Sequence, residues 1–498
     1  MFANLLNLTI DQKCLVAFVA LPSSLNFIKT MRTWMKRIVI AFVIVFFLLI
    51  LKVNCQNPQG SESIFQTYPL IQSLQSAQRT FSSNLILSIL NDNQRQQGTD
   101  TKLNNVVVSP FSVYVVLSMT LIGAKEETQR EMIRALGLNS STWAQIISQF
   151  SDASNLETNP LSQYILQLNA TDILQLANGL FVDKGYKLNP LYTAVVAAIY
   201  SSPVTQADFA HNAEQERMII NSWVAEKTNN LIHDLIPTGS LTVDTKLVLI
   251  NAIHFLGSWK IPFDEKLTSS QPFRHLVLTQ HSIGTASSGA SSSISSTATA
   301  NVDTMVRAGV HEYYGEDETY KWLVRPYSKE DYEMVFIIPK SNIELNLETE
   351  KQFDQWLSQK LLSSNSFGTS NQQISMIRIP KFKIEYETEM SQLFQQAPFN
   401  MTTAFSKDSA NFNGMLTEQS IQEGDRLWID KIFHKAYLKV DEKGTEAAAA
   451  TAVIIVGRTT SIDDEEQIDF IIDRPFAFVL RHAPSGIVLF TGKVNSLP

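Results

Sequence analysis

Residues 444–451 read Gly444-Thr445-Glu446-Ala447-Ala448-Ala449-Ala450-Thr451, and almost all of them are small. In a β-strand, alternate side chains point to opposite faces, so this run would place only small side chains on one of its faces. Those side chains belong to Thr445, Ala447, Ala449 and Thr451, while Glu446 lies on the other face. A run that begins with Gly and is rich in Ala has a weak propensity to form a permanent strand. The pattern therefore indicates a loop that can become a strand and insert its small face into a packed core.

The residues that follow this small-residue run change character twice. Residues 452–456 are apolar and mostly β-branched, and Gly457-Arg458-Thr459 is polar, so we expect it to be exposed. Arg458 is the one basic residue between Lys443 and Arg474. Taken alone, the stretch would also suit an Ala-rich helix or a linker, so the choice between these interpretations depends on motifs elsewhere in the chain.

Four helices are predicted in the first half of the chain. Ser109 is a good N-cap residue and Pro110 suits the first helical position, which predicts a helix that begins there after a short β-branched run. Residues 124–136 have an amphipathic pattern that is followed by Gly, which predicts a second helix. A third, apolar helix is predicted within residues 172–200, after a strand and a Lys-Gly-Tyr turn, and a fourth helix is predicted over residues 221–235.

A buried strand is predicted over residues 246–255, which are nearly all apolar. A strand that is buried on both faces shows such a continuous apolar run instead of an alternating one. Asn251 interrupts the run, and a polar side chain at such a position is costly unless it is hydrogen-bonded. We therefore expect a partner for Asn251 elsewhere in the core.

The order of these motifs along the chain resembles that of the serpin family. The resemblance is to its secreted, inhibitory members with an Arg reactive site, such as antithrombin-like and arthropod haemolymph serpins. It covers about residues 70–498 and implies an α+β fold, with helices around a large central β-sheet and an exposed reactive-centre loop over residues 442–465. The motifs that carry it are Ser109-Pro110, Asn251, Trp259, Phe433-His434-Lys435-Ala436, the run 444–451 and Pro475-Phe476.

The resemblance also implies roles for single residues. Gly444–Thr451 matches the hinge of the reactive-centre loop, and the bond between Arg458 and Thr459 falls where the family carries its scissile bond. Five further residues match positions under the central sheet or near the point where the loop enters it: Ser109, Ser112, Asn251, Trp259 and His434. A buried, neutral His434 that is hydrogen-bonded to Asn251 would have a structural role, and we assign it no acid–base function.

The function implied by the resemblance is suicide inhibition of a trypsin-like serine protease, by cleavage at Arg458-Thr459 followed by loop insertion. The alternative is a non-inhibitory serpin that acts as a carrier or chaperone. Non-inhibitory members tend to have bulky, charged or Pro residues on the inserting face, and this hinge has none there. The chain contains no motif of a serine hydrolase, zinc protease or nucleotide-binding enzyme, so we expect neither enzymatic activity nor a cofactor or metal.

The first 55 residues are expected to be absent from the mature protein. Residues 31–55 combine a cationic start, an apolar run shorter than a membrane span and small residues before Gln56, which is typical of a signal peptide. An uncleaved signal anchor is the alternative. Both cysteines, Cys14 and Cys55, lie in this segment. We therefore expect a secreted, extracellular protein with one serpin domain over 56–498, free of disulfides, and a Ser/Thr-rich surface insertion at 276–301.

Charge restricts the partners of such a mature chain. Removing the six basic and one acidic residue of positions 1–55 from the totals of 40 and 48 leaves 34 and 47, a net charge of −13. This argues against nucleic acid, an anionic membrane surface or heparin as a partner. We expect a monomer that forms a covalent acyl complex with its protease. Three sequons are candidate glycosylation sites: Asn139, Asn169 and Asn400.

Overall fold

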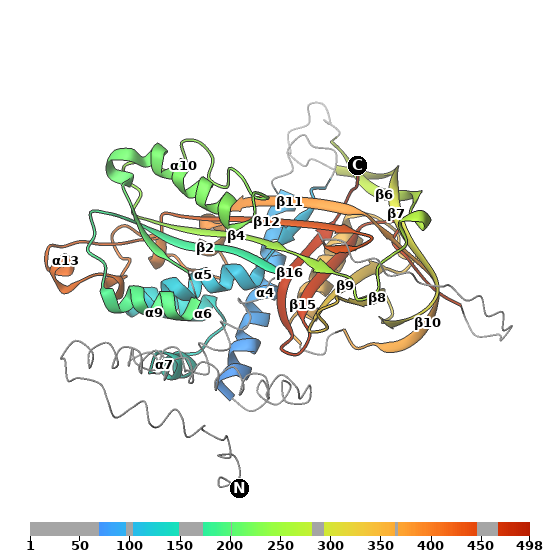
Figure 1. Cartoon of the computed structure of the whole chain (residues 1–498), viewed down its shortest axis with the longest axis horizontal. Coiled ribbons are helices and arrows are strands. Elements are labelled where there is room, and N and C mark those ends of the chain that lie inside the picture. Colours follow the sequence, from blue (N-terminus) through green and yellow to red (C-terminus); the bar gives the residue numbers. More distant parts are fainter. Residues whose placement is uncertain are drawn as a thin grey trace, which may run out of the picture. The chain divides into compact units, whose positions relative to one another are not determined.

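The computed structural model describes residues 69–95, 103–148, 173–200, 202–280, 293–363, 367–445 and 467–498. Within these residues the chain forms helices and two large β-sheets, and the predicted α+β class is confirmed (Figure 1). The helices are α4 (Pro69–Arg95), α5 (Pro110–Gly123), α6 (Glu126–Ala135), α7 (Ser140–Ser148), α9 (Pro190–Tyr200), α10 (Phe209–Lys227), α11 (Leu347–Lys360), α12 (Ser391–Gln395) and α13 (Glu418–Gln422).

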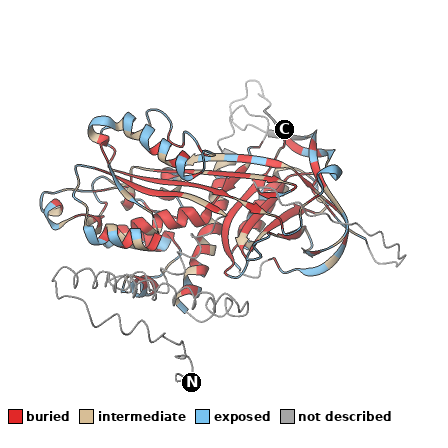
Figure 2. Cartoon of the chain, in the orientation of Figure 1, coloured by how far each residue is buried: buried red, intermediate tan, exposed pale blue. Residues whose placement is uncertain are grey.

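The first sheet has seven strands and contains the predicted buried strand. Its strands, in spatial order, are β3 (Val204–Ala207), β2 (Leu174–Asp183), β4 (Leu247–Phe255), β12 (Lys431–Asp441), β13 (Gly444–Thr445) and β5 (Gly257–Ser258), with β11 (Phe382–Glu389) also paired to β12. All residues of β4 are buried, as the continuous apolar run predicts (Figure 2). β4 runs antiparallel to β2 but parallel to β12, and β12 runs antiparallel to β11. β4 and β12 are therefore a parallel pair, and each of them has an antiparallel strand on its other side. We call the contact between β4 and β12 the joint.

The second sheet has nine strands. They are β1 (Val106–Val108), β16 (Ile487–Val494), β15 (Phe476–His482), β9 (Tyr332–Pro339), β8 (Tyr320–Pro326), β7 (Ser293–Glu316), β10 (Ser370–Pro380) and β14 (Ile468–Ile471), with β6 (Ser269–Gln280) paired to β7. β6 and β7 pair as far as Gln280 opposite Ser293. The predicted surface insertion at 276–301 is thus in part a pair of strands, because the hairpin extends into it from both sides.

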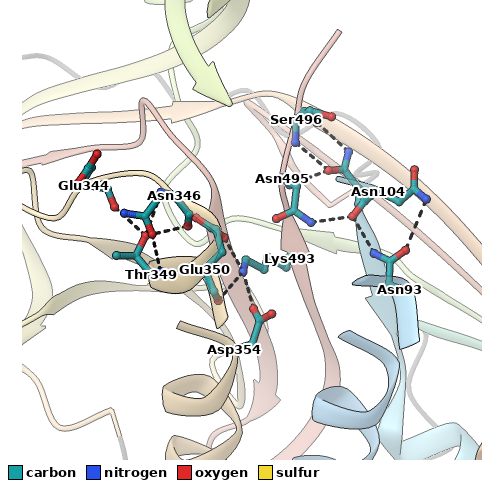
Figure 3. Close-up of polar contacts among 11 residues, drawn as sticks. Asn93, Asn104, Glu344, Asn346, Thr349, Glu350, Asp354, Lys493, Asn495 and Ser496 are labelled. Atoms are coloured by element: carbon teal, nitrogen blue, oxygen red, sulfur yellow. Dashed lines mark hydrogen bonds and ion pairs between the residues drawn. The ribbon is translucent and has the colours of Figure 1, made fainter. Parts of the chain in front are cut away.

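An ion cluster lies under the second sheet. Lys493 of β16 is 2% exposed, and its Nζ lies 2.6 Å from Oε2 of Glu350 and also contacts Oδ1 of Asp354, both on α11 (Figure 3). Burial alone would lower the pKa of Lys493, but the charges of Asp354 and Glu350 raise this pKa above its usual value. The cluster therefore connects α11 to the last strand of the chain through charges that have left water.

Three of the four predicted helices are confirmed, and α9 is the apolar helix expected within residues 172–200. Ser109 caps α5, since its hydroxyl accepts a hydrogen bond from the backbone N–H of Ser112 at 3.2 Å, and α6 lies within the second predicted segment. The helix predicted over 221–235 is wrong in its bounds, because α10 begins at Phe209 and ends at Lys227. Asn229 and Asn230 have φ values of 51° and 60°, in the left-handed region that Asn tolerates, and they turn the chain out of the helix.

Candidate functional site: the joint between β4 and β12

A cluster of neutral polar side chains crosses the parallel joint. Asn251 of β4 lies opposite His434 of β12 on one side and Asn178 of β2 on the other. Its Oδ1 contacts Nδ1 of His434 and accepts a hydrogen bond from the Ser112 hydroxyl at 3.0 Å. Its Nδ2 donates to Oδ1 of Asn178 at 2.5 Å. The predicted contact between His434 and Asn251 is present, and it satisfies the buried Asn251 side chain.

The protonation state of His434 follows from its surroundings. The ring is fully buried, and burial lowers the pKa of His434 to about 3, so the imidazole is neutral at pH 7. Its Nε2 accepts a hydrogen bond from the backbone N–H of Ser109 at 3.4 Å, which leaves Nδ1 as the protonated nitrogen that donates to Asn251. The side chains that form hydrogen bonds across the joint are therefore all neutral.

Asn178 is a member of this cluster that the sequence analysis missed. It is 4% exposed and occupies the middle of β2, whose residues around it are mostly apolar. A polar residue within an apolar run was the signal that singled out Asn251, and the same criterion applied to residues 174–183 would have found Asn178.

The start of the hinge lies in the sheet at one end of the joint. Gly444 and Thr445 form β13, which pairs antiparallel with β12 on one side and with β5 on the other. Gly444 has φ 150°, and a Cβ there would lie 2.0 Å from the carbonyl oxygen of Gly257, so only glycine fits. Thr445 is fully buried, and its hydroxyl is hydrogen-bonded to that of Tyr327 at 2.6 Å.

This position corrects the prediction that the whole hinge lies in an exposed loop. Beyond Tyr437 opposite His254, β12 no longer pairs with β4, and Gly444 and Thr445 lie between β12 and β5. Backbone N–H and C=O groups that are buried there require partners, which the strand β13 supplies. The other hinge residues and the scissile bond, Glu446–Thr451 and Arg458-Thr459, lie outside the described residues.

Trp259 and Glu442 fix the place where the hinge leaves β12. The indole of Trp259 stacks on Tyr327 at 4.6 Å between ring centroids, and its Nε1 donates to the carbonyl of Asp441 at 2.9 Å. Oε1 of Glu442 accepts from the Thr268 hydroxyl at 2.7 Å and lies 3.2 Å from Nζ of Lys381. Burial raises the pKa of Glu442, but these partners outweigh it and the pKa is lowered. Nothing local in the sequence points to Glu442, because its partners are distant in the chain.

The remaining predictions concern glycosylation sites, metal binding and membrane-spanning helices. Asn139 and Asn400 are exposed, whereas Asn169 lies outside the described residues. Within the part of the chain that the structure describes, no group of acidic, His or Cys side chains could hold a metal ion. None of the described helices combines the length and the apolar composition that crossing a membrane requires.

Comparison with known protein families decides the identity of this fold. The family profile described as "Serpin (serine protease inhibitor)" matches residues 77–497. The chain belongs to the serpin family. Among curated serpins, the leukocyte elastase inhibitor of Sus scrofa is 31% identical over 394 residues, which are 79% of this chain and 93% of the relative. An uncharacterized serpin-like protein of Methanosarcina acetivorans is 32% identical over 407 residues, 79% of this chain and 81% of the relative.

Solved serpin structures have the same fold. Serpin48 of the insect Tenebrio molitor aligns with a TM-score of 0.65 at 23% identity, covering 86% of this serpin and 99% of its own chain. AtSerpin1 of Arabidopsis, solved in its native stressed conformation, aligns with a TM-score of 0.63 at 27% identity, covering 85% and 98%. In the serpin described here, β4 and β12 are still paired directly, and only Gly444 and Thr445 of the described hinge residues lie between strands.

Proposed function

We propose that this serpin is an extracellular suicide inhibitor of trypsin-like serine proteases, with Arg458-Thr459 as the scissile bond. The observation that carries the proposal is the position of β13. This short strand already runs antiparallel to both β12 and β5 at the end of the parallel joint. If it lengthened between β4 and β12, one parallel pair would be replaced by two antiparallel pairs. Antiparallel pairing is the slightly more stable arrangement for each residue, so the native sheet favours insertion once the loop is cut.

The inward position of Thr445 sets the phase of the inserting strand. Because side chains alternate along a strand, Ala447, Ala449 and Thr451 would follow Thr445 into the core. All of these side chains are small, and none carries a charge that would oppose burial. Insertion from Thr445 to Arg458 would extend roughly 46 Å at about 3.3 Å for each residue. That length would carry a protease bound at Arg458 across the sheet.

The chemical step uses the target's own catalytic groups. A trypsin-like pocket has a carboxylate at its base, which binds the guanidinium of the residue before the scissile bond. The protease serine would attack the carbonyl carbon of Arg458 and form an ester, while the amine of Thr459 leaves with a proton from the catalytic imidazole. Insertion of the freed hinge would then distort the protease before water can hydrolyse the ester. The serpin contributes position and stored folding free energy, and no catalytic group.

The alternative function is that of a non-inhibitory carrier or chaperone, whose loop is cut without insertion. The small hinge residues favour inhibition. Secretion, glycosylation at Asn139, Asn169 and Asn400, and a monomeric state belong to the same proposal. They are supported by the predicted signal peptide, by the exposure of Asn139 and Asn400, and by the strongly acidic mature chain.

The scissile bond is tested with Arg458→Ala. The wild-type protein mixed with trypsin should give a complex that survives SDS, and mass spectrometry should show a released peptide that begins at Thr459. Arg458→Ala should lose this complex, since the pocket carboxylate loses its partner. Retained inhibition of trypsin with the cut at another bond would contradict the assignment of Arg458.

Insertion is tested with two neighbouring substitutions that differ only in the face they occupy. Ala447→Arg places a charge on the inserting face, and an unpaired buried charge costs several kcal/mol, so hydrolysis should outrun insertion. This variant should be cut at Arg458 and leave trypsin active. Ala448→Arg, on the solvent face, should still inhibit. Equal inhibition by both variants would show that the loop does not insert in the phase set by Thr445.

A further inference from the structure

A cavity of about 500 Å³ lies where β2 meets α9 and α10. It is lined by Leu176 and Asn178 of β2, Ala197 of α9, Ser202 and Pro203, and Trp223 and Lys227 of α10. In Figure 1, α10 crosses above the strand that carries Asn178. Ala197, Pro203 and Lys227 are exposed and form a rim, whereas Asn178 is 4% exposed. Cavities of this size hold ligands as large as small drugs.

Two of the three polar side chains that line this cavity, Asn178 and Lys227, offer hydrogen-bond donors, whereas the Ser202 hydroxyl donates to the carbonyl of Tyr200 at 3.1 Å. The Asn178 oxygen accepts from Asn251, whose own oxygen is occupied by Ser112 and His434, so the amide nitrogen of Asn178 is turned away from the cluster. Among the described residues, that nitrogen and the ammonium of Lys227 have no hydrogen-bond or ion-pair partner. No carboxylate lines the cavity. The Asn178 nitrogen is not among the fully buried atoms, so an acceptor on a ligand in the cavity can reach it.

The rest of the lining is apolar. Leu176, Ala197 and Pro203 offer aliphatic surface, and the Trp223 ring lies against Phe181 with 5.4 Å between ring centroids. From this combination we infer that the cavity binds a small amphipathic carboxylate. Its apolar body packs against Leu176 and Trp223, and its carboxylate accepts hydrogen bonds from Asn178 and Lys227.

Direct binding is tested by calorimetry on the full chain with decanoate, below its micellar concentration. Decyltrimethylammonium, of similar length and opposite charge, is the matched ligand control. Decanoate should bind saturably with one site and the cation should not, because the rim carries the ammonium of Lys227 and no carboxylate lines the cavity. Absence of saturable decanoate binding, or equal binding of the two ions, overturns the site.

Variants at the rim locate that binding. Lys227→Met keeps most of the side-chain volume and should weaken decanoate binding about tenfold, as expected for the loss of one charge-assisted hydrogen bond. Ala197→Trp fills the cavity from an exposed helix position and should remove binding. Lys266→Met, at an exposed lysine far along the chain, is the matched control and should bind as the wild type does. Unchanged affinity in both rim variants overturns the location.

A ligand here would also act on the joint between β4 and β12. It would hold Asn178, and through Asn178 it would hold the hydrogen bond to Asn251 that the joint uses. This second step rests on the proposed function, in which β4 and β12 part to admit the loop. Bound decanoate should therefore slow insertion and increase the fraction of serpin that trypsin cuts without forming a complex, and Lys227→Met should be insensitive.

Different results would overturn the binding site and its coupling to the joint. Decanoate binding with an unchanged ratio of complex to cut serpin overturns the coupling but supports the site. A wild-type protein that never forms a complex overturns the proposed function, and the calorimetric result supports or overturns the site independently.

Discussion

The joint between β4 and β12 and the pairing of β15 with β16 are two strand contacts of the same molecule that differ in strand direction and in the charge of the side chains that hold them. Both are buried, since every residue of β4 and of β16 is shielded from water. β4 and β12 are parallel and are held across the joint by neutral hydrogen bonds of Asn251. β15 and β16 are antiparallel, and β16 is held from below by a buried lysine between two carboxylates. Burial therefore does not distinguish the two contacts, whereas strand direction and the ion cluster beside β16 do.

The difference has a physical reason. A neutral hydrogen bond contributes only about 1 kcal/mol net and can be exchanged for another partner, such as an inserting strand. Separating a buried ion cluster leaves uncompensated charges in a medium of low dielectric constant, which costs several kcal/mol. In the proposed mechanism, the first sheet would therefore part around a new strand, while the second sheet would stay intact.

The largest expected effect comes from removing the lysine of the ion cluster under the second sheet. Lys493→Met should destabilise the protein by about 3–5 kcal/mol, because Glu350 and Asp354 would be left buried without a counter-charge. The urea midpoint of unfolding measures the loss. The control is Lys260→Met, which removes an exposed ion pair with Glu330 and should change stability by less than about 1 kcal/mol. Equal midpoints for the two variants would contradict the role assigned to the cluster.

A smaller effect is expected at the joint. Asn251→Leu would leave Asn178, Ser112 and His434 without their shared partner and should destabilise the native state by about 3 kcal/mol or less. Ile253→Leu, an apolar exchange in the same strand, should cost less than about 1.5 kcal/mol. Thermal unfolding of both variants gives the comparison. A variant Asn251→Leu that is as stable as the wild type would mean that the cluster does not hold the joint.

The smallest effect is the change in folding stability per unit of pH that is caused by two buried histidines, one in each sheet. Burial lowers the pKa of His434, in the first sheet, to about 3 and that of His482, in β15, to about 4. Because the unfolded chain binds a proton near pH 6.5 and the folded chain does not, stability is highest above pH 6.5. It should fall by roughly 1.4 kcal/mol per pH unit for each histidine as the pH drops from 6.5 toward the folded pKa.

Urea unfolding between pH 5 and pH 7 measures this dependence, and single variants assign it to a sheet. His434→Gln and His482→Gln should each flatten the slope by about one proton's share. A slope that neither variant changes would show that other groups control acid stability in this range.

The sequence predicted the parts of this structure that depend on neighbours along the chain. The cap of α5 by Ser109 and the buried strand β4 follow from local patterns, and the partner of Asn251 followed from a resemblance in motif order. The burial of Thr445 could not be predicted, since it depends on where β12 and β4 stop pairing. The ion cluster could not be predicted for a related reason, because Lys493 lies 139 positions from Asp354 and no local pattern connects them.

The position of β16 after β4 and β12 in the chain has a consequence for biosynthesis. Among the described strands, β1 pairs with β16, and Asn495 donates to the carbonyl of Asn104 from 391 positions away (Figure 3). During translation, β4 and β12 are both made before β16, so the first sheet can form before the second sheet is closed. Contacts this distant in sequence form late and slowly. Synthesis of β16 is therefore the event that allows β1 and the second sheet to reach their native pairing.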